Sequence, residues 1–422
     1  MTFVADWFAL LGLALLILGI AGILLIAATL RLPVGALSPL AIAIDGDIAL
    51  SATALGVLGM LPPIGFAIAG LTAPSVAHRL GLERTLLLAI VVMIAGTLVR
   101  AVAPDFIVLT LGSLLLLLGA GFGNVLLPSA VKRYTPGAIG PMTAAYATIM
   151  SIGSALPPLL AVPLAEQSGW RVSLASWAII VGVALVPWIL LVVRAARTRT
   201  AARTAAARGV VLDDIAEPDT HRFAQLARSR TVWGITIPFT VSSISAYATF
   251  ALLPVMLQDL SGVTAAEAGT LLALFAILGM PLALVAPVLA ARLRTPTPIL
   301  LTSMALFSVG YGGLLAAPTA APALWVAAIG LGQITFPMCL ALFSLRTASA
   351  ENAANVSGFV QTVGYSVAAI SPLALGALHE LTGSWAPSLI VLLGIVALTA
   401  FAMPLLARGS LVEDELGRDL DR

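Results

Sequence analysis

The sequence predicts an all-α membrane protein with twelve transmembrane helices in two pseudo-symmetric bundles of six. Three observations lead to this prediction. Hydrophobic residues make up 60% of the 422 residues and charged residues only 9%, whereas a soluble domain carries about 25% charged residues. Twelve apolar runs are each long enough for the roughly 20 residues that a membrane-spanning helix needs. Short strings also repeat between the two halves of the chain.

The twelve runs follow one another along the chain. The first six lie at residues 12–43, 52–76, 85–103, 106–130, 138–165 and 172–193. The other six lie at residues 231–257, 265–290, 297–317, 322–345, 353–378 and 385–407. The first run is too long for a straight span. It therefore either begins as a surface helix or projects into the cytoplasm.

One long polar stretch, from Arg194 to Arg230, separates the sixth run from the seventh. Its mixture of arginines and acids indicates a solvated linker lying on anionic lipid headgroups. We therefore divide the chain into an N-terminal six-helix bundle at 1–193, a cytoplasmic linker at 194–230, a C-terminal six-helix bundle at 231–408 and a cytoplasmic tail at 409–422.

The charged residues predict the orientation, because cytoplasmic loops carry an excess of Lys and Arg. If both termini are cytoplasmic, the outer loops are acidic and only Arg171 and Arg100 oppose their acids. Arg100 is expected to form an ion pair with Asp105. Besides the linker arginines, the inner loops then hold Arg79, Arg84, Lys132, Arg133, Arg292, Arg294, Arg346 and Arg408. We expect a multi-pass protein of the cytoplasmic membrane.

A first set of matches between the halves lies in the second and eighth runs. The string SATALG at Ser51 matches TAAEAG at Thr264, and the same register matches Arg79 with Arg292. Parallel halves related by an axis along the membrane normal are typical of major facilitator transporters, whose solute site lies between the halves near the membrane midplane.

A second set of matches brings two amides to related places. The string GFGNVLLP at Gly121 matches GLGQITFP at Gly330, and so Asn124 matches Gln333. Two amides that face a shared cavity could both donate and accept hydrogen bonds to a small solute. The alternative is that each amide bonds a neighbouring helix.

Four longer strings resemble a known family. They are TLRLPVGALSPL around Arg31, GFGNVLLPSAVKR from Gly121, GLGQITFPMCLALFSLR from Gly330 and NVSGFVQTVGYSVAAISPLALGALHELTGSW from Asn355. Through both halves, the chain resembles the cyanate/2-nitroimidazole permease family of the major facilitator superfamily. The resemblance implies twelve helices, alternating access and a small polar or anionic solute.

The loop between the second and third runs resembles the loop signature of facilitators at the inner gate. It reads PSVAHRLGLER, in which Arg79 and Gly81 fit that signature. His78 stands where the signature usually has Asp, so the usual carboxylate is missing from the charge relay. The repeat adds Arg292 to this gate from the second half.

Arg31 is the only cation deep within an apolar run. Asp45 follows 14 residues later, about 21 Å along a helix, which places Arg31 well inside a hydrocarbon core about 30 Å thick. A charge there costs about 2.5–3.5 kcal/mol and is usually functional. Its guanidinium could bind an anionic or nitro-bearing solute. The alternative is that the span ends near Leu30 and that Arg31 snorkels to an interface.

Four further polar side chains lie deep in the runs. They are Tyr146 in the fifth run, Tyr247 in the seventh, and Gln361 and Tyr365 in the eleventh. The resemblance implies that these spans line the solute cavity. Gln361 and Tyr365 are four residues apart and share one helix face. Each of the four, taken singly, is equally consistent with a hydrogen bond between packed helices.

The sequence thus predicts a secondary active transporter that moves a small polar or anionic solute, such as cyanate, across the cytoplasmic membrane. The alternative is an efflux transporter for nitro-heterocycles or related toxic compounds. No carboxylate lies deep in a run to carry a proton. Either the proton travels with the solute as a neutral acid, or transport is facilitated or proceeds by exchange.

Other classes of function lack their residues. There is no His/Asp/Glu cluster, no metal-ligand spacing and no nucleophile beside a base, so we expect neither an enzyme nor a cofactor or metal. There is no basic patch for a nucleic acid. The expected partners are a small solute and the lipid bilayer, and the expected state is a monomer.

Overall fold

The computed structural model describes the chain except for residues 1, 33–36, 38–39, 51, 195–221 and 421–422. The described residues are helical and hold no β-strand. Ten stretches of them are long and apolar enough to cross a membrane, and α1 (Thr2–Leu30) and α7 (Ile139–Ser168) complete the twelve. The prediction of an all-α membrane protein is therefore confirmed.

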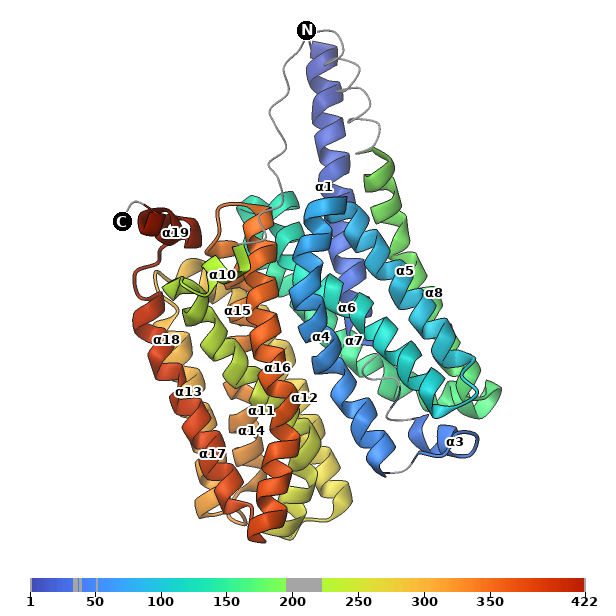
Figure 1. The fold of residues 1–422 in the computed structure, drawn as a ribbon, viewed down its shortest axis with the longest axis vertical. Coiled ribbons are helices and arrows are strands. Elements are labelled where there is room, and N and C mark those ends of the chain that lie inside the picture. Colours follow the sequence, from blue (N-terminus) through green and yellow to red (C-terminus); the bar gives the residue numbers. More distant parts are fainter. Residues whose placement is uncertain (1, 33–36, 38–39, 51, 195–221, 421–422) are drawn as a thin grey trace.

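The N-terminal half occupies the blue to green part of Figure 1. Helix α5 follows Gly81, whose φ of +88° suits glycine. Helix α6 is capped by Asp105, whose carboxylate accepts a hydrogen bond from the backbone N of Val108. After α1 the elements are α3 (Ala41–Asp45), α4 (Ala52–Leu80), α5 (Leu82–Ala101), α6 (Phe106–Tyr134), η2 (Pro136–Ala138), α7 and α8 (Trp170–Val183).

The C-terminal half occupies the yellow-green to red part of Figure 1. Its second long helix, α12, begins with a capping box of Thr264 and Glu267. The elements are α10 (Arg222–Leu226), α11 (Arg230–Ser261), α12 (Ala265–Arg292), α13 (Thr297–Ala316), α14 (Pro322–Gly332), α15 (Thr335–Leu345), α16 (Ala350–Thr382), α17 (Ala386–Ala397), α18 (Thr399–Leu406) and α19 (Val412–Leu420). Most of the expected linker falls on residues 195–221, outside the described residues.

Two expectations are corrected by the helix ends and by burial. The first apolar run does not continue to residue 43 as one helix, because α1 ends at Leu30. The first turns of α1 project beyond the neighbouring helices (Figure 1). The expected ion pair of Arg100 with Asp105 is not found among the described residues. Arg100 is instead buried inside the N-terminal half, where only 3% of it is exposed.

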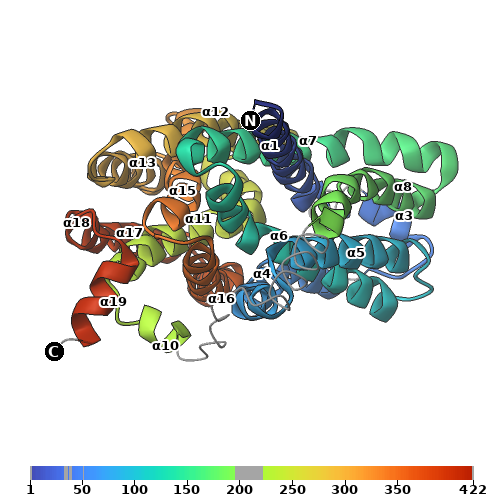
Figure 2. The same cartoon turned by 90° about the horizontal axis from the view of Figure 1, so that it is seen from above.

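The two halves share a hydrophobic core at one end of the molecule only. We call this the tail end, because it carries α19 (Figures 1 and 2), and we call the opposite end the far end. The shared core includes Ile26 and Leu126 of the first half with Met338 and Phe343 of the second. At the far end each half has a separate core of its own. The halves are therefore joined at the tail end.

Matching pairs hold the far end of each half. In the first half, the indole N–H of Trp170 donates to a carboxylate oxygen of Asp47 at 3.0 Å. In the second half, the indole N–H of Trp385 donates to Asp259 at 2.7 Å. Trp170 is the first residue of α8 and Trp385 directly precedes α17, and these two helices occupy equivalent places in the two bundles. The same contact therefore occurs at equivalent places in the two halves, as expected for a structural repeat.

Candidate functional site

Arg31 lies between the two halves, directly after the end of α1. Its guanidinium carbon is 5.9 Å from the ring centroid of Phe66, in α4 of its own half. It is 5.7 Å from the ring centroid of Phe336, in α15 of the other half. Although α1 does end at Leu30, these contacts with both halves place the cation at the boundary between the two halves. We call this boundary the seam.

A cluster of five aromatic side chains lies beside this cation, and we call it the aromatic cage: Phe66, Phe239, Tyr247, Phe336 and Tyr365. Tyr365 packs at its centre, with its ring centroid 5.4 Å from that of Phe66, 5.2 Å from that of Phe239 and 6.2 Å from that of Tyr247. Phe239 also stacks on Phe336 at 5.5 Å. Such ring pairs favour tilted or offset packing. The guanidinium of Arg31 interacts with the hydroxyls of Tyr247 and Tyr365.

A buried amide bridge joins the halves beside the cage. The side-chain N–H of Asn124, in α6, donates to the side-chain oxygen of Gln361, in α16, at 2.6 Å. The amide nitrogen of Gln361 in turn donates to the hydroxyl of Ser357 at 2.8 Å. Asn124 is 3% exposed and Gln361 is fully buried. The bridge is therefore a direct polar contact between the two bundles.

Pro128 explains why the backbone carbonyl of Asn124 also accepts a hydrogen bond from the other half. Proline has no N–H, so the carbonyl of the residue four positions earlier loses its helical partner. That residue is Asn124, and its carbonyl accepts from the Gln361 amide at 3.4 Å. In the repeat, Pro337 frees the carbonyl of Gln333 in the same way. There the helix breaks between α14 and α15, and the backbone N of Phe336 donates to that carbonyl at 3.0 Å.

The structure does not bring Gln333 together with Asn124. The amide of Gln333 faces α11, where it hydrogen-bonds the hydroxyl of Ser242. With its nitrogen turned toward Ser242, its oxygen also accepts from the backbone N of Ala246 at 3.2 Å. Gln333 thus ties two helices of the same half together, which is the helix-packing role that the sequence left open for it.

Tyr146 of α7 is 1% exposed within the core that both halves share. Its hydroxyl and that of Thr143, one helical turn earlier, are buried and have no hydrogen-bond partner among the described residues. Tyr146 belongs to neither the cage nor the amide bridge. Of the seven predicted binding residues, the structure gathers Arg31, Asn124, Tyr247, Gln361 and Tyr365 at the seam.

The predicted gate loop lies at the tail end. His78, in the last turn of α4, reaches the other half: its Nε2 is 3.8 Å from the carboxylate of Glu351, in the first turn of α16. Arg79 and Arg292 are exposed at the ends of α4 and α12. Gly81 supplies the positive φ between α4 and α5. Of these four residues, only His78 lies within 4.0 Å of a carboxylate of the other half among the described residues.

Close backbone packing brings the halves together near this loop. A Cβ added to Gly358 of α16 would lie 2.5 Å from the carbonyl oxygen of Gly70 in α4. The hydroxyl of Ser344 donates to the carbonyl of Pro128 at 2.8 Å, and the ammonium of Lys132 donates to the carbonyl of Ser344 at 3.3 Å. The tail end is therefore closed.

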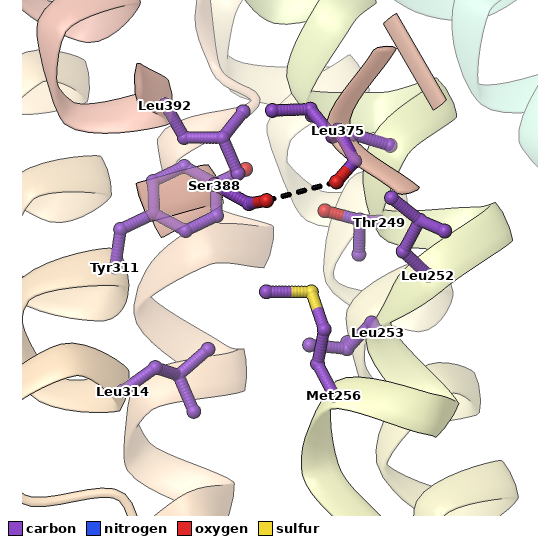
Figure 3. A pocket seen from close by; sticks show the side chains of 10 residues that line it. Thr249, Leu252, Leu253, Met256, Tyr311, Leu314, Leu375, Ser388 and Leu392 are labelled. Carbon is purple, nitrogen blue, oxygen red and sulfur yellow. Dashed lines mark hydrogen bonds between the residues drawn. The ribbon is translucent and has the colours of Figure 1, made fainter. Parts of the chain in front are cut away.

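Small cavities inside the bundles are not solute sites. One lies in the C-terminal half, among Leu253, Met256, Tyr311 and Leu314 (Figure 3). Its volume is about 10 Å³, which holds at most one water molecule. The hydroxyl of Ser388, at its edge, is already bonded to the carbonyl of Leu375 at 2.9 Å. The cavity is a packing gap.

Sequence reasoning missed the phenylalanines of the cage and the partners that cross the seam. Phe66, Phe239 and Phe336 stand in apolar runs where phenylalanine carries no distinguishing signal. Glu351 lies outside the runs and gives no hint of its contact. One usable signal was present: the spacing Asn-x-x-x-Pro and Gln-x-x-x-Pro marks the two carbonyls that proline releases.

Comparison with known proteins agrees with this fold. The family model described as "Major Facilitator Superfamily" matches residues 20–372. Over 382 residues the chain is 30% identical to the 2-nitroimidazole transporter of Escherichia coli (strain K12), covering 90% of this chain and 92% of that protein. It is 26% identical to the cyanate transport protein CynX of the same organism over 326 residues, covering 75% of this chain and 79% of that one.

A solved structure supports the fold alone, because its identity is low. The proton:xylose symporter XylE, bound to 6-bromo-6-deoxy-D-glucose, superposes with a TM-score of 0.71 at 14% identity. The match covers 96% of this chain and 98% of that one. The family match spans most of the residues and both bundles. The chain therefore belongs to the major facilitator superfamily, and it is a multi-pass membrane transporter of small solutes.

Proposed function

We propose that this transporter moves a small polar or anionic solute, such as cyanate, across the cytoplasmic membrane by alternating access, and that Arg31 is its principal ligand. One observation carries the proposal. Arg31 is a cation at the seam, and no carboxylate of the described residues forms an ion pair with it. A charge placed there is costly unless it serves a partner. An anion entering between the halves supplies that partner.

The same geometry supports a mechanism. The rocking units are the bundles at 1–193 and 231–408, joined by a cytoplasmic linker at 194–230 and followed by a cytoplasmic tail at 409–422. The tail end carries Arg79, Arg84, Lys132 and Arg133, so the positive-inside rule assigns it to the cytoplasm. Because the halves share their core at that end, the conformation is closed toward the cytoplasm. The transporter acts as a monomer in the inner membrane.

Charge movement limits how an anion is imported. Carrying one negative charge inward costs about 2.3 kcal/mol per 100 mV of inside-negative potential. Glu83 is a buried carboxylate in the first turn of α5, but Tyr134 donates to it at 2.7 Å and Arg133 pairs with it at 3.1 Å. The carboxylate of Glu83 is therefore already bonded to residues of the tail end. The solute therefore crosses with its own proton as a neutral acid, or it moves by facilitated transport or exchange.

A second candidate function is efflux of nitro-heterocycles or related toxic compounds. The aromatic cage favours it, because a heterocyclic ring can pack on aromatic faces while its nitro oxygens accept from Arg31. The relative at 30% identity is named as a 2-nitroimidazole transporter. Resistance that depends on Arg31 without any solute uptake supports this candidate over the first.

Uptake of labelled cyanate into proteoliposomes tests the proposal. We expect Arg31→Gln to lower the initial rate at least tenfold, since hydrogen bonds to charged groups contribute about 1.5–3 kcal/mol and 1.4 kcal/mol is a tenfold change. Arg84→Gln is the matched control, because Arg84 is an exposed arginine at the start of α5. It should transport at the rate of the intact protein.

The outcomes separate the alternatives. A normal rate in Arg31→Gln, with an unchanged thermal melt, removes Arg31 as the ligand. If the intact protein carries no cyanate, that solute is excluded. Efflux of 2-nitroimidazole from loaded vesicles is then the measurement that decides the second candidate.

A further inference from the structure

We propose that Thr143 and Tyr146 of α7 form a second binding position for the solute, on the cytoplasmic side of Arg31, which the closed tail end covers. Its ligands are two hydroxyl groups, and they suit a solute end rich in hydrogen-bond acceptors, such as an anion or a nitro group. The inference rests on the proposed function, because it assumes that a solute crosses by alternating access. It adds a step on the path between Arg31 and the cytoplasm.

The first argument is that both hydroxyls are buried without a hydrogen bond. Thr143 is fully buried and Tyr146 is 1% exposed. The Thr143 side chain lies near enough to influence the Tyr146 hydroxyl, but no hydrogen bond satisfies either hydroxyl among the described residues. A buried hydroxyl without such a bond is costly, and each one in a native structure calls for an explanation.

The second argument is that the neighbouring hydroxyls of α7 avoid this cost. Those of Thr148, Ser151 and Ser154 donate to the carbonyls four residues earlier in their own helix, at 2.8, 3.0 and 3.0 Å. Serine and threonine in a helix commonly bond in this way. Thr143 does not. Its hydroxyl and that of Tyr146 therefore keep their capacity for a partner that is not part of the closed conformation.

The third argument is where α7 places the pair along the molecule. A Cβ added to Gly153 would lie 2.6 Å from the carbonyl oxygen of Ala28 in α1, three residues before Arg31. Tyr146 precedes Gly153 by seven residues, or about 10 Å along the helix. Helix α7 begins at the tail end, shortly after the last turn of α6 that helps to close it. The pair therefore lies between the level of Arg31 and the cytoplasm.

The fourth argument is that the pair faces the other half. At the start of α7, a Cβ added to Gly140 would lie 3.0 Å from the carbonyl oxygen of Pro287 in α12. At about 100° per residue, Thr143 and Tyr146 lie on the shorter arc of α7 between this contact with α12 and the contact of Gly153 with α1. Tyr146 belongs to the core that both halves share. Parting the halves at the tail end therefore uncovers both hydroxyls.

Transport kinetics measured from each side of the membrane test the inference. Uptake of labelled cyanate into inside-out vesicles measures entry from the cytoplasm, and uptake into right-side-out vesicles measures entry from the other side. Thr143→Val and Tyr146→Phe each remove one hydroxyl and so one hydrogen bond to the solute. We expect each to raise the KM about three- to tenfold in inside-out vesicles and to leave it within about twofold in right-side-out vesicles. An unchanged KM in inside-out vesicles overturns the inference.

Two control variants separate binding from folding. Thr148→Val removes a hydroxyl of the same helix that is bonded to its own backbone, and it should leave the KM unchanged from both sides. Thr143→Ser keeps a hydroxyl and should keep the KM of the intact protein.

The melting temperature gives a second readout. Thr143→Val and Tyr146→Phe should keep or raise it, because the closed conformation then no longer buries a hydroxyl without a hydrogen bond. A lower melting temperature in both variants would show that the hydroxyls have structural partners, which overturns the inference.

The inference and the proposed function fail in different ways. If transport depends on Arg31 and both variants match the KM of the intact protein from both sides, the second position is wrong and the proposed function stands. If the variants raise the KM equally from both sides, the hydroxyls act at the site of Arg31 and the second position is again wrong. Where no cyanate enters, labelled 2-nitroimidazole takes its place. If neither solute moves, the proposed function fails and the inference fails with it.

Discussion

At the scale of single residues, the contact between Asn124 and Gln361 links the two halves through two buried hydrogen bonds, one of 2.6 Å between the side chains and one of 3.4 Å from the Gln361 amide to the Asn124 carbonyl. Removing either partner leaves the other amide buried with an unmade bond, which costs about 1–3 kcal/mol. Removing both side chains removes the penalty of an unmatched amide, and only the Asn124 carbonyl and the Ser357 hydroxyl still lose their bonds to Gln361. The bridge therefore contributes to the stability of the closed tail end through the pair, not through either residue alone.

A double-mutant cycle measures this coupling. We expect Asn124→Ala and Gln361→Ala each to lower the free energy of unfolding by about 1–3 kcal/mol. The double variant should lose less than the sum, with a coupling of about 0.6–1.7 kcal/mol. Ser388→Ala, in the far part of the second half, should add to Asn124→Ala within about 0.5 kcal/mol. Strict additivity of Asn124 with Gln361 would contradict the bridge.

At the scale of elements, α19 docks on the start of α11 through Glu415. The carboxylate accepts from the hydroxyls of Ser229, Thr231 and Ser410 at 2.7 Å each, and from the backbone N of Thr231 at 3.1 Å. Burial by itself would raise the pKa of this carboxyl, but the four hydrogen bonds outweigh burial and lower the pKa below its ordinary value of 4.5. A negative charge also suits the N-terminus of a helix.

The lowered pKa predicts how the docking of α19 depends on pH. A carboxyl whose folded pKa is depressed stabilises the folded state above its unfolded pKa, and the stabilisation is lost as the pH falls through the folded value. We expect Glu415→Gln to lower the melting temperature at pH 7. The difference from the intact protein should shrink as the pH falls below about 4.5.

An exposed carboxylate serves as the control for this experiment. Glu380→Gln, near the far end of α16, should leave the melting temperature unchanged at pH 7. Hydrogen exchange of residues 410–416 gives a local readout of the docked tail. Equal protection in Glu415→Gln and the intact protein at pH 7 would show that Glu415 does not hold α19.

At the scale of the whole molecule, the two halves meet through small residues at the tail end and have separate cores at the far end. The backbones of α4 and α16 approach so closely that any side chain at Gly358 meets the carbonyl of Gly70. The closed tail end therefore depends on the absence of a methyl group there.

We expect Gly358→Ala to shift the conformational equilibrium toward a molecule open at the tail end. The added Cβ would lie 2.5 Å from the carbonyl oxygen of Gly70, and backbone cannot give way as a flexible side chain can. Spin labels at Arg84→Cys and Arg294→Cys, in a Cys339→Ala background, report the separation of the halves. Their distance should increase in the variant.

Gly376→Ala is the matched control on the same helix. A Cβ at Gly376 meets only the side chain of Leu252, at an ordinary 3.9 Å, so its label distance should equal that of the parent. An unchanged distance in Gly358→Ala would mean that the tail end is not held closed by this contact.

The class of the protein could be predicted from its sequence because the signals for it are local. Apolar runs of sufficient length predict spans wherever they stand in the chain, and the matching strings from Gly121 and Gly330 predict two related halves. The structure and the family match confirm the fold and the family predicted from these signals. The end of α1 at Leu30 was harder to predict, because hydropathy continues past the point where the helix stops.

The partners across the seam could not be predicted, since they depend on how two separately formed bundles pack. Asn124 was matched by the repeat with Gln333, yet it bonds Gln361, which lies 237 residues away in the chain. A repeat relates equivalent positions, whereas contact depends on which faces of α6 and α16 meet. The phenylalanines around Arg31 were missed for the same reason.

By itself, the sequence determined the membrane class, the twelve spans, the duplicated halves and the unusual cation, because each can be recognised in a short stretch of chain. Only the tertiary structure decided that Arg31 lies between Phe66 and Phe336, that Asn124 bonds Gln361, and that the halves meet at the tail end. The physical reason is packing: a contact between distant residues exists only when both helices bring the right faces to one place.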